Sequence, residues 1–227
     1  MAIALQSKSR TAVHAAGLCS FSFSFWLLTQ LTNKADNAFG WHFMYLTIIG
    51  LGLSAMVYFL ALLHDIRPHP GIDHAKQLCL VVAYPIEALI TILYWSIVLY
   101  DDHLMHGDDQ ERLPFLLDAT YHLFPAIALW IEFLAFSDNF KRSIKHIYVI
   151  YSFALLYGIW LQVCYYYNGF WPYPFFHLME HHHRVAVYLS SATLCSFIYM
   201  TGATVHTRLH LAKQHLLHQV KQSDKLL

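Results

Sequence analysis

Three side chains that could act together in catalysis lie in apolar stretches of this sequence: Thr47, Asp118 and His122. A threonine hydroxyl becomes a useful nucleophile when a base removes its proton, and imidazole is the usual base near neutral pH. Asp118 precedes His122 by one helical turn, so the two share a helix face and the carboxylate can orient the ring. The sequence therefore predicts Thr47 as nucleophile, His122 as base and Asp118 as an orienting acid.

The same residues also have a structural interpretation. Threonine in a membrane helix commonly bonds the carbonyl four residues earlier. A buried histidine such as His122 is as often held by a structural hydrogen bond as used in catalysis, although ionisable groups at membrane depth usually face a protein cavity. A non-catalytic membrane binding protein is therefore one alternative.

A second group of histidines follows the fifth apolar stretch and consists of His177, His181, His182 and His183. Histidines at such spacing can hold zinc or iron, as in membrane desaturases and hydroxylases. Those enzymes need several histidine pairs on the cytosolic side, whereas this group is predicted on the opposite side, with only His103 and His106 nearby. We expect ordinary interfacial histidines and no metal here, and a metal-dependent membrane lipid oxidase is the second alternative.

The composition shows which elements must position these residues. Apolar residues make up 57% of the chain and charged residues 12%, against about 25% charged residues in a soluble domain. The formal net charge is zero, which argues against nucleic acid as a partner. Six stretches approach the roughly 20 residues that cross a bilayer as a helix, at 12–31, 43–63, 78–100, 113–136, 146–168 and 184–204. We therefore expect an all-α fold, a single integral membrane domain over 1–227 with six transmembrane helices.

The distribution of basic residues predicts the orientation of this bundle. If the N-terminus is cytosolic, the opposite side holds only Lys34, Arg112 and Arg184, and the acidic loop 101–112 lies there too. The cytosolic segments then hold Lys8, Arg10, Arg67, Lys76, Lys141, Arg142, Lys145, Arg208, Lys213, Lys221 and Lys225. Basic residues favour the cytosolic side, so both termini and the charged tail 205–227 are predicted to be cytosolic.

Prolines and glutamates inside the predicted helices are also informative. Pro85 and Pro125 each remove a backbone donor and are expected to kink their helices, which can open a pocket in the bundle. Glu87 and Glu132 are expected to face the interior, because a charged side chain facing lipid costs about 2.5–3.5 kcal/mol. The four cysteines lie within predicted spans and are interpreted as packing residues.

Several strings of residues, in order along the chain, resemble the androgen-induced FAR-17a family. The first runs from Trp41 to Thr47, and the second from Ala83-Tyr84-Pro85 through Tyr94-Trp95 to Tyr100-Asp101. The third pairs His122 with Glu132. The fourth begins at Tyr157-Gly158-Ile159-Trp160 and leads to Gly169-Phe170-Trp171-Pro172-Tyr173-Pro174-Phe175.

The resemblance implies an activity. Characterised relatives are multi-pass membrane hydrolases that cleave fatty acid esters of hydroxy fatty acids with a threonine nucleophile and a histidine. Carried over, these residues become Thr47 and His122, whereas Asp118 as an orienting acid is inferred from its spacing alone. The expected substrate is a lipid ester that enters from the bilayer, with no cofactor. The relatives suggest the plasma membrane, and the endoplasmic reticulum or another endomembrane remains an alternative.

Overall fold

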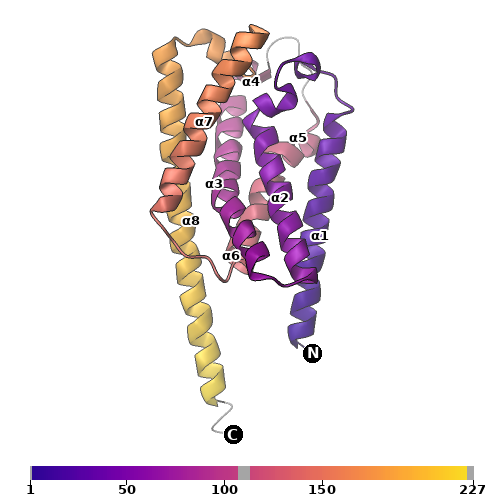
Figure 1. Ribbon diagram of the computed structural model, residues 1–227, viewed down its shortest axis with the longest axis vertical. Helices are drawn as coiled ribbons and strands as arrows, with labels where there is room; N and C mark the ends of the chain where they lie inside the picture. Colours follow the sequence, from indigo (N-terminus) through magenta and orange to yellow (C-terminus); the bar gives the residue numbers. More distant parts are fainter. Residues whose placement is uncertain (1, 107–112, 224–227) are drawn as a thin grey trace.

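The computed structural model describes residues 2–106 and 113–223, so the predicted acidic loop from residue 107 onward and Lys225 lie outside the described residues. Every regular element in those ranges is a helix (Figure 1). The long helices are α1 (Ala2–Leu28), α2 (Leu46–Ile66), α3 (Pro70–Tyr100), α7 (Lys145–Asn168) and α8 (His181–Ser223). Three short α-helices lie between α3 and α7, namely α4 (His103–His106), α5 (Phe115–His122) and α6 (Phe124–Phe136). Single 3-10 turns are η1 (Lys34–Asn37), η2 (Trp41–Met44) and η3 (Pro174–Leu178).

Five of these helices are long and apolar enough to cross a membrane, and the bent pair of α5 and α6 makes a sixth crossing if it counts as one span. This agrees with the predicted all-helical bundle of six transmembrane segments. Both termini lie at the same end of the bundle, here called the terminal end (Figure 1). The connections that carry η1, η2, α4 and η3 lie at the opposite, distal end (Figure 1).

The segment 113–136 was expected to be one helix kinked at Pro125, and it is instead broken. α5 ends at His122, α6 begins at Phe124, and the two axes meet at 43°. Pro125 lies in the first turn of α6, where a missing backbone N–H costs nothing. The break places His122 at the end of a helix rather than in its middle. Pro85, by contrast, lies inside α3 without interrupting it.

The last helix is longer than the predicted span 184–204. α8 runs without interruption from His181 to Ser223, so the described part of the predicted tail is helical. After Gly202 this region contains neither glycine nor proline, and its leucines and glutamines favour helix. Its last turns extend beyond the other helices at the terminal end (Figure 1).

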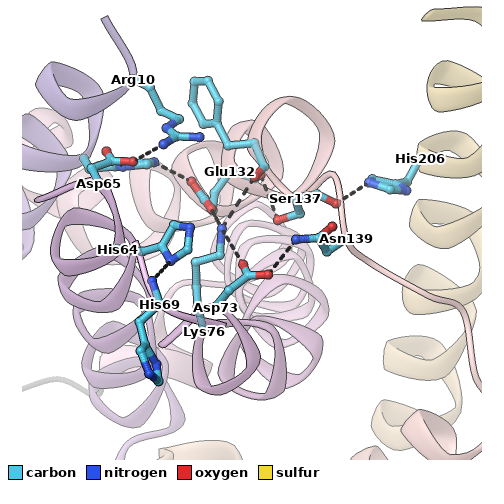
Figure 2. Close-up of polar contacts among 12 residues, drawn as sticks. Arg10, His64, Asp65, His69, Asp73, Lys76, Glu132, Ser137, Asn139 and His206 are labelled. Atoms are coloured by element: carbon cyan, nitrogen blue, oxygen red, sulfur yellow. Dashed lines mark hydrogen bonds and ion pairs between the residues drawn. The ribbon is translucent and has the colours of Figure 1, made fainter. Parts of the chain in front are cut away.

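A buried network of charged side chains joins four helices at the terminal end (Figure 2). His14 of α1 lies 2.6 Å from Asp65 of α2 through Nδ1 and 2.8 Å from Glu132 of α6 through Nε2. Lys76 of α3 donates to the other oxygen of Glu132 at 2.8 Å, and Arg10 pairs with Asp65 at 2.6 Å. Glu132 therefore faces the interior, as expected, and the network fixes α1, α2, α3 and α6 against one another.

Candidate active site

Thr47 lies in the first turn of α2, at the distal end of the bundle. Within the described residues its hydroxyl makes no hydrogen bond, so the expected structural bond to a carbonyl four residues earlier is not formed. Its backbone N–H also lacks an acceptor there, because residues at the start of a helix have no intrahelical partner. The amino end of a helix carries a partial positive charge that favours developing negative charge nearby. The position thus offers a nucleophile and an amide donor together.

A tight turn brings the chain into this position. Gly40 has φ +85°, and a Cβ there would lie 2.9 Å from Cys164 Sγ and 2.9 Å from the Trp160 ring. Glycine is needed both for the left-handed backbone and for the close approach of α7. The turn leads into η2 and then, through Tyr45, into α2.

Three aromatic side chains bond the backbone immediately before Thr47. The Trp160 indole N–H donates to the Phe43 carbonyl at 3.0 Å, and the Tyr157 hydroxyl donates to the Met44 carbonyl at 3.0 Å. The Leu46 N–H donates to the Tyr173 hydroxyl at 2.8 Å. Burial raises the pKa of Tyr173, which keeps this phenol neutral. Segments more than 100 residues further along the chain therefore fix the entry to α2.

His122 and Asp118 form the pair that their spacing predicts. His122 Nδ1 lies 2.7 Å from Asp118 Oδ1, and Tyr94 Oη donates to both carboxylate oxygens at 2.8 Å. The Tyr94 ring stacks on the imidazole with centroids 3.5 Å apart and planes 1° from parallel. With Nδ1–H directed to the carboxylate, Nε2 is left as the basic nitrogen, and it has no hydrogen-bond partner among residues 2–106 and 113–223.

A second histidine and carboxylate extend this arrangement toward the distal surface. His106 Nε2 lies 3.2 Å from Tyr94 Oη, and its Nδ1 lies 2.9 Å from Asp102 Oδ1. Tyr94 thus connects the Asp118–His122 pair with α4. The sequence interpretation placed His106 only beside the second group of histidines and missed both Tyr94 and Asp102 as site residues.

A third histidine contributes to the same region. His42 is 1% exposed, and its Nε2 lies 2.8 Å from Asp36 Oδ1. A hydrogen bond from the Asn33 backbone N–H and the bond from His42 lower the pKa of Asp36, so that carboxylate remains ionised. This pair holds η1 against η2 and was not anticipated from sequence, because no helical spacing connects the two residues.

These groups line a cavity of about 680 Å³ at the distal end, here called the polar cavity because it contains them, although leucine and proline side chains form much of its wall. Thr47 and His122 both line it, together with Asp118, Tyr94, His106, His42 and Lys34. A second, narrower pocket of about 120 Å³ has almost entirely aliphatic and aromatic walls and lies between α3, α7 and α8. Thr47 lines this apolar pocket as well, whereas His122 does not. Thr47 therefore lies where an apolar space meets a polar one.

The second group of histidines is only partly brought together. Ligand atoms of His182 and His183 lie within 4.8 Å of one another and of Glu180, and all three residues are exposed. His177 Nε2 instead accepts from the Trp171 N–H at 3.4 Å, and His181 is outside this group. Glu180 had not been included in the set expected from sequence, because only histidines had been considered.

The fold and the cavity are those of a multi-pass integral membrane protein with a polar site inside the bundle. The profile of the FAR-17a/AIG1-like protein family matches residues 9–207, and the chain belongs to this family. It is 29% identical to UPF0641 membrane protein PJ4664.05 of Schizosaccharomyces pombe over 187 residues, 80% of this chain and 84% of the relative. It is 21% identical to the androgen-induced gene 1 protein of Homo sapiens over 208 residues, 85% of this chain and 87% of the relative. No solved structure matches the chain significantly.

Proposed function

We propose that this protein is an intramembrane hydrolase of lipid esters, with Thr47 as nucleophile, His122 as base and Asp118 as orienting acid. The observation that carries the proposal is that the unbonded hydroxyl of Thr47 and the imidazole of His122 line one cavity, and that Thr47 also lines a separate apolar pocket. Such a pair of adjoining spaces suits a molecule with a polar centre and a hydrocarbon chain. The family resemblance favours fatty acid esters of hydroxy fatty acids as the substrate.

The chemistry follows a two-step acyl transfer. Thr47 Oγ1 attacks the ester carbonyl carbon while its proton passes to His122 Nε2. The tetrahedral intermediate expels the alcohol, which takes that proton and leaves an acyl group on Thr47. Water then attacks the acyl carbon, His122 takes the water proton, and Thr47 recovers it as the carboxylic acid leaves. The Thr47 N–H at the start of α2 is placed to donate to the oxyanion.

A fluorophosphonate probe tests this proposal in membranes that contain the wild-type protein or a variant. We expect labelling in wild type and in Thr47→Ser, which keeps the hydroxyl, and loss of labelling in Thr47→Ala and His122→Ala at equal protein level. Equal labelling of wild type and Thr47→Ala would reject Thr47 as the nucleophile.

The exposed group of Glu180, His182 and His183 favours a second candidate, a metal-dependent lipid oxidase. Iron at one equivalent in purified protein, lost on alanine substitution of His182 and His183, would support it, whereas zinc has no redox chemistry and would not. The membrane in which the protein resides is a separate question. We propose the plasma membrane, and fluorescence imaging of the tagged protein would distinguish it from the endoplasmic reticulum.

A further inference from the structure

The apolar pocket has a defined depth below Thr47. Its walls come from α3, α7 and α8, and the lining residues farthest from the distal end on these helices are Ile86, Ile150 and Cys195. Each of the three is 2% exposed, and all belong to one packed core, so the pocket is closed below them. On α3 the lining runs from Ile97 to Ile86, and Tyr94, which lines both spaces as Thr47 does, lies eight residues or about 12 Å above Ile86 at 1.5 Å per residue. On α8 it runs from Val187 to Cys195, again about 12 Å.

The polar cavity and the apolar pocket would receive different parts of an ester substrate. This inference rests on the proposed function. The leaving alcohol must receive a proton from His122, which lines only the polar cavity. The alcohol part therefore belongs in the polar cavity, and the acyl part, on the opposite side of the carbonyl carbon, belongs in the apolar pocket.

We propose that the apolar pocket binds the acyl chain of the substrate and that its floor, formed by Ile86, Ile150 and Cys195, sets the length of chain that is bound. A C–C bond of about 1.5 Å in a tetrahedral zigzag advances an extended chain by about 1.25 Å per carbon. A depth of about 12 Å therefore matches the length of about ten carbons, and the walls of this narrow pocket must move apart to admit them. Longer acyl chains must bend or leave the pocket between helices, and their extra carbons gain no further burial there.

The test uses para-nitrophenyl esters of straight-chain acids, from butanoyl to hexadecanoyl, with the full-length protein in detergent micelles. At a fixed mole fraction of ester in the micelles, each methylene that packs in the pocket is expected to raise kcat/KM through van der Waals contacts, and the rise is expected to stop at about ten carbons. Ala192 lines the pocket one helical turn above Cys195. Ala192→Phe should therefore stop the rise about four carbons earlier, while activity on the butanoyl ester is retained. Ala186→Phe, on an exposed face of the same helix, is the matched control and should leave the length profile unchanged.

A photoreactive fatty acid with a terminal diazirine separates failure of this proposal from failure of the hydrolase. The expected adduct lies on the α8 peptide that contains Cys195, in wild type and in Thr47→Ala alike. Adducts there without any ester hydrolysis would support the chain-binding pocket and reject the hydrolase. Hydrolysis with a length profile that Ala192→Phe does not change would overturn the proposal and leave the hydrolase intact.

Discussion

At the residue scale, Tyr94 organises the polar cavity more than any residue singled out from sequence. Its hydroxyl contacts Asp118 and His106, and its ring covers the flat face of His122. Tyr94 touches the proposed base and its carboxylate, so it acts as a positioning residue. Tyr94 belongs to one of the strings that resemble the family, but no spacing relates it to Asp118 or His122, which is why sequence analysis missed its role.

Tyr94→Phe keeps the stacked ring and removes only the hydroxyl. We expect ester hydrolysis to fall about tenfold or more in kcat with little change in KM, because a hydrogen bond to a charged group contributes about 1.5–3 kcal/mol. The comparison is Tyr100→Phe, since Tyr100 lies on the same helix and is 85% exposed. Similar activity in both variants would show that the Tyr94 hydroxyl does not position the pair.

At the element scale, the entry to α2 is held by contacts that reach it from α7 and from the segment before α8. Trp41 to Thr47 and the segments Tyr157–Trp160 and Trp171–Pro174 were recognised as separate strings, yet they meet in space. Their meeting could not be derived from sequence, because no periodicity relates residues more than 100 positions apart.

The six-span fold could be derived, since it follows from the length of each apolar stretch. The break at Leu123 was only partly anticipated, as a kink at Pro125.

The contribution of the tight turn at Gly40 to stability and activity can be tested with Gly169 as the control. Gly40 and Gly169 both have left-handed backbones, with φ +85° and +71°, but only Gly40 lacks space for a Cβ. We expect Gly169→Ala to lower stability by about 1–2 kcal/mol, the cost of a left-handed backbone for alanine. Gly40→Ala should lower it by more and also reduce activity, because α7 must move away from the turn. Thermal unfolding in micelles and hydrolysis rates check this, and equal losses in the two variants would contradict it.

At the scale of the whole molecule, the buried network at the terminal end holds the bundle together. Glu132 is fully buried and bonds both His14 and Lys76, so Glu132→Gln removes the carboxylate closest to Lys76 and leaves it only the more distant Asp73, at 3.8 Å. We expect a loss of about 3–5 kcal/mol in stability, measured by thermal unfolding in micelles. Glu87→Gln is the control, because Glu87 is equally buried but bonds only the Ser54 hydroxyl. A comparable loss in both variants would show that burial alone, rather than the ion pairs, accounts for the effect.

The orientation of the bundle also belongs to this scale. Both termini lie at one end, as an even number of crossings requires (Figure 1). The excess of lysine and arginine at that end predicts that it is cytosolic. Epitope tags at either terminus should therefore be stained in intact cells only after the plasma membrane is permeabilised. Staining of unpermeabilised cells at either tag would reverse the predicted orientation, and with it the side on which the polar cavity opens.

The position of His14 has a consequence for how the protein is made. Both its ring nitrogens face carboxylates, and one of these, Glu132, is encoded 118 residues later. During synthesis Asp65 of α2 follows His14 by 51 residues, whereas Glu132 of α6 follows it by 118. A polar group of this kind is poorly tolerated by lipid alone. The surroundings that His14 has in the folded bundle are therefore complete only when α6 has joined α1 and α2.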